Sequence, residues 1–248
     1  MKGSMALNAY VDLINSQWMK AGSYERRGPD GSRLGVVTIS RQAGSGAHVV
    51  ADAMVAKLQA AAPKGASPWT IFDKNLVEKV LEDHDLPARL AASMPEDRRS
   101  EMTDTLDSLF GQKATSWALV KKTAETILHL AEMGNVVIIG RGANLITADL
   151  DNAIHVRLVG SPERRIEHLM DYRHQSLAEA QEYARTEELG RARYVKKYYS
   201  ADIEDPLLYD LVINTDRVPY EEAGGLIADA LSARLAHLPA KKPPVLMA

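Results

Sequence analysis

The chain has no cysteine among its 248 residues. This absence excludes disulfide bonds, thiolate metal sites and a cysteine nucleophile, and it fits a reducing compartment such as the cytoplasm. The sequence also has no apolar run of about eighteen residues, the length needed to span a bilayer. It has no basic segment leading into a short apolar stretch, the pattern that directs export. We therefore expect a soluble, cytoplasmic protein that does not bind membranes.

The sequence also has little net charge. It contains 30 Lys and Arg against 33 Asp and Glu, a formal charge of −3. This balance gives no electrostatic basis for binding nucleic acid, which requires an excess of basic groups. Hydrophobic residues make up 46% of the chain, enough for a substantial core. The length predicts one large domain, or one domain with an inserted lid.

One stretch combines an apolar β-branched run, a turn rich in small residues and the start of a helical pattern, from Val36 to His48. This order directs backbone N–H groups and a helix N-terminus at an anion. Only part of the phosphate-loop signature G-x-x-x-x-G-K-[ST] is present. With Gly46 as the second glycine, Arg41 takes the place of the first. Ala47 then stands at the position of the lysine and His48 at that of the Ser or Thr. The order of strand, turn and helix therefore predicts a phosphate loop more strongly than the match to the signature residues does.

The two ends of the chain lie outside the main pattern. Residues 1–34 show helical spacing and then a turn, which predicts a docking helix and a candidate contact for a homo-oligomer. Residues 239–248 are rich in proline and predict a flexible tail. The domain between them spans residues 35–238.

Apolar strands alternate with helical patterns along this domain. We expect strands at 36–39, 69–73, 136–139, 154–159 and 209–215, and helices at 49–58, 74–84, 86–133, from 162, 177–199 and 219–238. Strands separated by helices indicate βαβ units and hence a parallel sheet. Ligands of such sheets bind at the carboxyl ends of the strands.

Arginines mark two places in this pattern. Arg141 lies between two glycines, directly after the apolar run of residues 136–139. Its guanidinium is suited to grip a phosphate through two hydrogen bonds, although a solvated arginine in a turn is the alternative. A second group of basic residues lies between 164 and 197. It predicts an anion-binding helical region, or a solvated pair of helices whose glutamates balance the charge.

Six stretches of the chain carry a resemblance to a known family. They are TISRQAGSGAHVVA, FDKNLVEKV, VVIIGRGANLI, HVRLVGSPERRIEHL, GRARYVKKYY and DPLLYDLVINT, and they cover roughly residues 35–232. In this order the chain resembles the cytidylate kinase-like family of P-loop proteins. The resemblance implies an α/β P-loop NTPase fold with a five-stranded parallel sheet flanked by helices. It also implies a helical acceptor-binding region and a helical lid at about residues 164–200.

The resemblance further implies an activity, which is transfer of the terminal phosphoryl group of ATP to CMP or dCMP with Mg²⁺. Nucleotides are then the expected partners. It assigns the donor phosphates to Ser40, Gln42, Ala43, Gly44, Ser45, Gly46, Ala47 and His48. No residue is assigned to the metal.

The resemblance assigns the acceptor to three residues. Asp73 matches the acidic residue after the second strand, and Arg141 matches the arginine that grips the acceptor phosphate. Asp210 matches the aspartate that helps to read the base. Arg165 matches the first arginine of the lid, and Arg191 matches the arginine of a later D-x-x-R element.

Transfer between nucleotides depends on positioning and on neutralising charge, and the acceptor phosphate needs no general base. The candidate catalytic residues are therefore four arginines, Arg41, Arg141, Arg165 and Arg191.

Several positions depart from the family pattern. His48 stands where this branch often has an arginine, and Ala47 stands at the P-loop lysine. Glu188 replaces the aspartate of D-x-x-R, and His168 stands where a second lid arginine is common. Loss of a fixed cation at His48 would slow transfer, and Arg41 is the candidate to compensate. Two alternatives stay open: a nucleotide-binding module without turnover, and a kinase of another small molecule.

Overall fold

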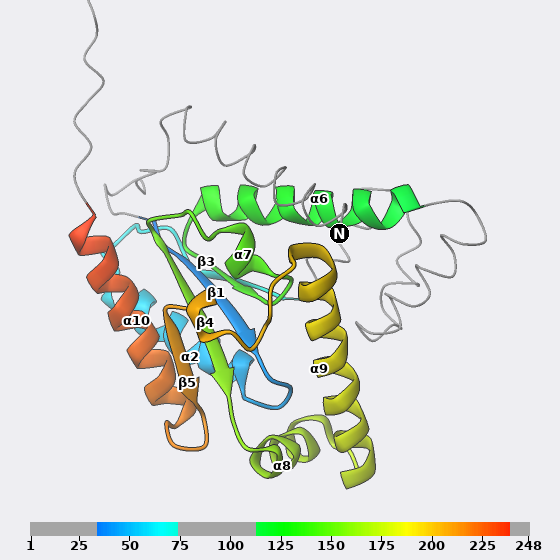
Figure 1. Ribbon diagram of the computed structural model, residues 1–248. Helices are drawn as coiled ribbons and strands as arrows, with labels where there is room; N and C mark the ends of the chain where they lie inside the picture. Colours follow the sequence, from blue (N-terminus) through cyan, green and yellow to red (C-terminus); the bar gives the residue numbers. More distant parts are fainter. Residues whose placement is uncertain (1–33, 74–112, 239–248) are drawn as a thin grey trace, which may run out of the picture.

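The computed structural model describes residues 34–73 and 113–238, which form a sheet flanked by helices (Figure 1). The strands are β1 Val36–Arg41, β2 Thr70–Phe72, β3 Val136–Ile139, β4 Ala153–Val159 and β5 Leu211–Asn214. They lie in the order β2-β3-β1-β4-β5, and all four pairings are parallel. The predicted five-stranded parallel sheet is confirmed.

The described helices are α2 Ala47–Ala61, α6 Lys113–Met133, α7 Ala143–Ile146, α8 Pro162–Arg173, α9 Leu177–Tyr199 and α10 Tyr220–His237, with a 3₁₀ turn η1 at Pro206–Leu208. Ser161 caps α8 by accepting a hydrogen bond from the Arg164 amide, and Ser176 forms a capping box with Glu179 at the start of α9. The helices predicted in residues 1–33, 74–84 and 86–112, and the tail at 239–248, lie outside the described residues.

Alternating strand residues build two cores, one on each face of the sheet. On one face, Ile39 and Val156 pack with Met54 of α2 and Leu231 of α10. On the other face, Val36, Ile138 and other strand residues pack against α6, α7 and the end of α9. Burial on both faces explains why the central strands read as continuous apolar runs.

β1 is the central strand, and this position fixes where a site can form. Val36 pairs in register with Val136 of β3 on one side and with Ala153 of β4 on the other. The turn after β1 therefore emerges at the middle of the carboxyl edge, and Figure 1 shows α8 and α9 beyond that edge. In the parts of the chain that are described, no helix is long and apolar enough to cross a membrane.

Candidate active site

The turn between β1 and α2 is built around two glycines in the left-handed region. Gly44 has a φ of 81° and Gly46, the N-cap of α2, a φ of 76°. A Cβ at Gly44 would collide with the backbone carbonyl of Arg165, and one at Gly46 with the ring of Tyr220. Glycine therefore lets the turn pack between α8 and α10 while the first amides of α2 stay at the carboxyl edge. This is the geometry of an anion-binding loop.

Side chains within the loop hold its shape. The Gln42 side-chain oxygen accepts a hydrogen bond of 3.0 Å from the Gly160 amide. The Ser45 hydroxyl donates to the Gln42 carbonyl at 2.9 Å. Both residues were expected to contact donor phosphates, and in the structure their side chains brace the turn. The backbone amides are the groups this loop offers to an anion.

Two arginines from the helical pair α8 and α9 lie against this loop. Arg165 donates from Nε to the Gly160 carbonyl and from Nη1 to the Ala43 carbonyl, each at 2.9 Å. Arg191 donates from Nη1 to the Arg41 carbonyl at 3.3 Å. Both guanidinium groups are about nine-tenths buried, with side-chain exposures of 8% and 10%. The structure thus brings both predicted lid arginines to the loop.

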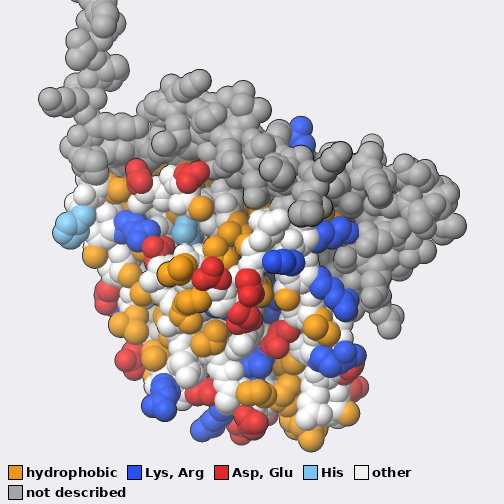
Figure 2. All heavy atoms as spheres, viewed as in Figure 1, with side chains coloured by type: hydrophobic (Ala, Val, Ile, Leu, Met, Phe, Trp, Pro, Cys, Tyr) orange, Lys and Arg blue, Asp and Glu red, His pale blue; other side chains and the backbone are white. Residues whose placement is uncertain are grey.

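Each of these arginines is paired with a glutamate of α9. Arg165 pairs with Glu188, and Arg191 pairs with Glu187 at 2.9 Å. Figure 2 shows Lys and Arg interspersed with Asp and Glu over the described face that carries these helices. The surface there is mixed in charge.

The turn after β3 lies beside the loop. Gly140, Arg141 and Gly142 all have positive φ, at 88°, 61° and 66°. A non-glycine residue in this region costs about 1 kcal/mol or more, and such residues concentrate at functional sites. A Cβ at Gly140 would collide with the guanidinium of Arg41, so the missing side chain makes room for that arginine. The segments carrying Arg41 and Arg141 therefore meet.

Asp73 and His48 come together at the far side of the loop. Asp73 directly follows β2, and its Oδ2 lies 3.4 Å from Nε2 of His48 in the first turn of α2. Asp73 follows β2, Arg141 follows β3 and the loop follows β1. Because β3 lies between β2 and β1 in the sheet, the turn that carries Arg141 lies between Asp73 and the loop. The segments that carry Asp73, Arg141 and the phosphate loop thus share the carboxyl edge of the sheet.

Asp210 is not brought to this group. It precedes β5, and its backbone amide donates to the carbonyl of His155, a residue paired in register with Thr38 in the middle of β1. Its carboxylate accepts 2.7 Å hydrogen bonds from the His155 amide and from Nη2 of Arg234. Burial acts to raise the pKa of Asp210, but these hydrogen bonds outweigh it and lower the pKa. Its contacts are those of a structural ion pair.

An ion pair beneath the loop, with a buried arginine and an exposed glutamate, was not predicted from the sequence. Arg157 of β4, with a side chain only 3% exposed, pairs with Glu204 and donates from Nη1 to the Ser40 hydroxyl at 2.9 Å. The Tyr209 hydroxyl lies 3.2 Å from the Ser40 hydroxyl and donates its proton to the Ile203 carbonyl at 2.9 Å. The Ser40 side chain is thus held by neighbours. An arginine inside an apolar strand signals that Arg157 needs polar partners, although it does not identify them.

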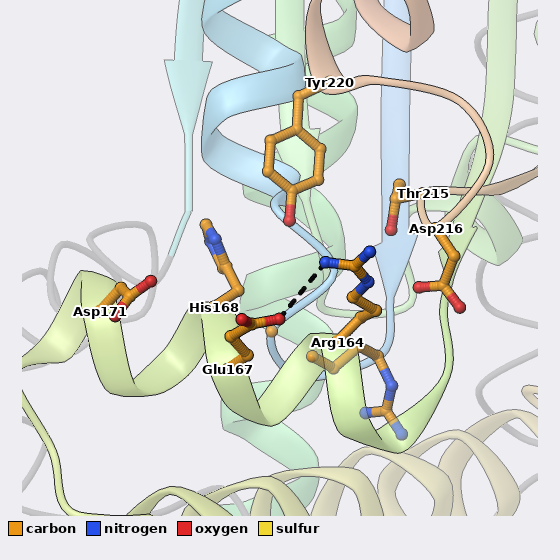
Figure 3. Close-up of a pocket in the computed structure, with 9 residues that line it drawn as sticks. Arg164, Glu167, His168, Asp171, Thr215, Asp216 and Tyr220 are labelled. Carbon is orange, nitrogen blue, oxygen red and sulfur yellow. Dashed lines mark hydrogen bonds and ion pairs between the residues drawn. The ribbon is translucent and has the colours of Figure 1, made fainter.

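A cavity of about 350 Å³ adjoins the loop at Gly44. Figure 3 shows it between α8 and the start of α10, with the Arg164 guanidinium and the side chains of His168 and Tyr220 directed into the same space. The two rings meet edge to face at 5.3 Å. Burial lowers the pKa of His168, so this ring favours its neutral form. No residue pattern pointed to this cavity, because its walls come from three separate segments.

The central loop, the parallel sheet and the helical pair over the loop define a P-loop kinase fold. The sequence model of the cytidylate kinase-like family matches residues 36–217, and the chain belongs to this family. It is similar to a protein described as cytidylate kinase from Haloquadratum walsbyi, with 26% identity over 198 residues that cover 80% of this chain and 90% of that protein.

A solved structure also shares the fold. An uncharacterized protein from Eubacterium ventriosum superposes with a TM-score of 0.59 at 19% identity, covering 80% of this chain and 99% of that one. A shikimate kinase from Bacteroides thetaiotaomicron is more distant, with a TM-score of 0.43 at 13% identity over 80% of this chain and 99% of that one.

Proposed function

We propose that the protein transfers the terminal phosphoryl group of ATP to a nucleoside monophosphate, with CMP or dCMP as the acceptor. The observation that carries this proposal is the approach of Arg165 and Arg191 to the backbone of one phosphate loop. Membership of the cytidylate kinase-like family supports the reaction class. The name of the Haloquadratum walsbyi relative supports the choice of acceptor.

The donor binds at the loop and the adjoining cavity. Its phosphates accept hydrogen bonds from amides of residues 43–48, where the dipole of α2 also favours negative charge. The cavity of about 350 Å³ lies in the range of small-molecule sites and takes the nucleoside. There the Tyr220 and His168 rings offer apolar faces to a base, and Thr215 and Asp216 offer polar atoms.

The acceptor binds on the other side of the loop, at the ends of β2 and β3. Arg141 grips its phosphate through the guanidinium fork, and Asp73 accepts a hydrogen bond from its sugar or base. Asp210 takes no part in this proposal because its oxygens bind His155 and Arg234.

The reaction requires positioning and charge. An oxygen of the acceptor phosphate attacks the terminal phosphorus of ATP, and the bond from that phosphorus to the bridging oxygen of ADP breaks. Charge on the transferred group is spread over its oxygens, where Arg41, Arg165 and Arg191 stabilise it. Burial of Arg165 and Arg191 strengthens their interactions, since the local dielectric is low.

The residues present fit a magnesium ion held mainly by nucleotide phosphates. Among the described residues, no three His, Cys, Asp or Glu side chains cluster into a metal site. Magnesium suits such a site, because it keeps several waters and takes one or two carboxylates together with substrate phosphates. Asp73 keeps its role toward the acceptor in this proposal, and no protein side chain is assigned to the ion. When bound, the ion neutralises charge on the donor phosphates.

The test measures ADP formation by the purified protein with ATP, magnesium and each of CMP, dCMP, UMP and AMP. We expect the highest kcat/KM with CMP or dCMP, and only background ADP without an acceptor. Turnover that favours AMP would overturn the choice of acceptor. No turnover with any acceptor, with ATP binding intact in calorimetry, would overturn the reaction.

That last outcome would favour the second candidate, a nucleotide-binding module. One observation supports it. Both lid arginines are already neutralised by Glu187 and Glu188, and His48 supplies no fixed charge.

A further inference from the structure

One carboxylate joins the loop to both helices above it. Oε1 of Glu188, on α9, accepts a hydrogen bond of 3.2 Å from the backbone amide of Ala43 in the loop. The same oxygen pairs with the guanidinium of Arg165 on α8. The Glu188 side chain is 35% exposed, whereas that of Arg165 is 8% exposed. The loop, α8 and α9 therefore converge on a single oxygen atom.

The groups that hold this oxygen are those that bind phosphates. A loop amide at the carboxyl edge of a parallel sheet and a buried guanidinium are both strong donors to phosphoryl oxygens. A carboxylate oxygen and a phosphoryl oxygen cannot both take the same two donors. Two anions this close would also repel each other strongly in a partly buried site. Binding of one requires displacement of the other.

The neighbouring glutamate shows that this contact is specific to position 188. Glu187 pairs with Arg191 four residues further along the same helix, at 2.9 Å. That pair lies within α9. Glu188 instead reaches across to α8 and to the loop.

We propose that Glu188 competes with the terminal phosphate of the donor for the Ala43 amide and the Arg165 guanidinium. The proposal rests on the donor site described under the proposed function. Binding of ATP moves the carboxylate off both donors, and Arg165 exchanges a glutamate oxygen for a phosphoryl oxygen. Glu188 thereby sets the affinity for the phosphate part of the donor, and it keeps Arg165 at the loop until that exchange.

Reach matters as much as charge. Aspartate at this position has a side chain shorter by one carbon–carbon bond, about 1.5 Å. From the same helix position it keeps the negative charge but loses simultaneous contact with the amide and the guanidinium. Glutamine keeps the length and loses the charge. Glu188→Asp and Glu188→Gln therefore separate these two properties.

The experiment measures Kd by calorimetry for three probes: ATP with magnesium, inorganic tripolyphosphate, and adenosine. We expect Glu188→Asp and Glu188→Gln each to lower the Kd for ATP and for tripolyphosphate by about tenfold, the value of one charge-assisted hydrogen bond. The Kd for adenosine stays unchanged, because adenosine carries no phosphate. Thermal unfolding of each variant confirms that it is folded, and either variant alone decides the result.

Glu182→Gln is the matched control. Glu182 lies on the same helix, is 63% exposed and pairs with Arg185, so the substitution makes the same change in net charge. We expect it to bind all three probes like the wild type. An equal gain in Glu182→Gln, or wild-type affinity in Glu188→Asp, would assign the effect to net charge and overturn the proposal. Weaker phosphate binding in both Glu188 variants would also overturn it.

The outcome also separates this inference from the proposed function. A wild-type protein that binds ATP, with Glu188 variants that bind it no better, overturns the competition and leaves the donor site standing. A wild type and variants that all fail to bind ATP and tripolyphosphate overturn the donor site itself, and the competition with it.

Discussion

Nε2 of His48 lies 3.4 Å from Oδ2 of Asp73, and this contact joins the first turn of α2 to the end of β2. His48 is half exposed, with 47% of its side chain accessible, and Asp73 is 20% exposed. His48 thus lies between the phosphate loop and the proposed acceptor site at the end of β2.

Restoring a fixed cation at this position tests its importance for transfer. We expect His48→Arg to raise kcat with CMP by about a hundredfold, since one electrostatic donor at an active site is worth about 3 kcal/mol. The Asp73 carboxylate holds the new guanidinium in place. The measurement is steady-state ADP formation at saturating ATP. His237→Arg on the exposed end of α10 is the control, and an equal gain there would refute a local effect.

Arg165 supplies a test of guanidinium geometry. Its Nε and Nη1 bind two backbone carbonyls at 2.9 Å as well as Glu188, and a lysine ammonium cannot reproduce this fork. We expect Arg165→Lys to lower kcat by about a hundredfold. The matched control is Arg185→Lys, an exposed arginine on α9. Activity that survives Arg165→Lys would remove the catalytic role assigned to this residue.

The loop glycines permit a comparison at equal backbone strain. Gly44 and Gly65 both have positive φ, at 81° and 88°, but only the Cβ added at Gly44 meets another residue. We expect Gly65→Ala to cost about 1–2 kcal/mol in free energy of unfolding, the price of the left-handed conformation alone. Gly44→Ala costs more and abolishes ATP binding, because α8 must move away from the loop. Urea denaturation and calorimetry measure the two effects.

Asp210 and Arg141 are predicted to behave differently toward the acceptor. Arg141→Ala removes the phosphate contact and should raise the KM for CMP by tenfold or more, about the 1.4 kcal/mol of one lost interaction. Asp210→Asn removes the ion pair with Arg234, so we expect a lower Tm with an unchanged KM for CMP. A higher KM for CMP in Asp210→Asn would instead support a role of Asp210 in recognising the base.

His155 makes stability depend on pH. Burial lowers its pKa from the ordinary value of 6.5, and Arg234 adds to this against the opposing effect of Asp210. The unfolded chain then binds a proton more readily than the folded one between the two pKa values. The stability contributed by His155 is therefore complete above pH 6.5 and is lost as the pH falls from 6.5 toward the lowered pKa of the folded state.

Urea denaturation at pH 7 and pH 5 measures this loss. His155→Gln should flatten the dependence, whereas His174→Gln at an exposed position should leave it as in the wild type. A wild-type slope in His155→Gln would contradict the assignment.

The positions of the strands in the sequence were predictable, because a strand buried on both faces appears as a continuous apolar run, as at Val136–Ile139. Arg141 and Asp73 were predicted to lie at the carboxyl edge, because each directly follows a strand of a parallel sheet. Asp210 precedes its strand and lies away from that edge. Direction along a strand therefore decided which polar residues came together.

Contacts between distant segments were beyond sequence reasoning. Arg157 and Glu204 meet because β4 and the segment before η1 fold together, and no spacing in the chain signals that pairing. The reach of Glu188 to Ala43 likewise depends on how α9 crosses the loop. Helix caps at Ser161 and Ser176 were predictable, since their partners lie three residues away.

The central place of β1 has a consequence for how the chain is made. Thr38 binds His155, a residue 117 positions later, and the Gly160 amide donates to Gln42 across 118 positions. Contacts at such separation form slowly, because a long stretch of chain must be ordered before they give stability. During synthesis β1 leaves the ribosome early but waits for β3 and β4 to follow. A nascent chain that ends before residue 136 contains every residue of the phosphate loop and none of the contacts with β3, β4, α8 and α9 that hold it.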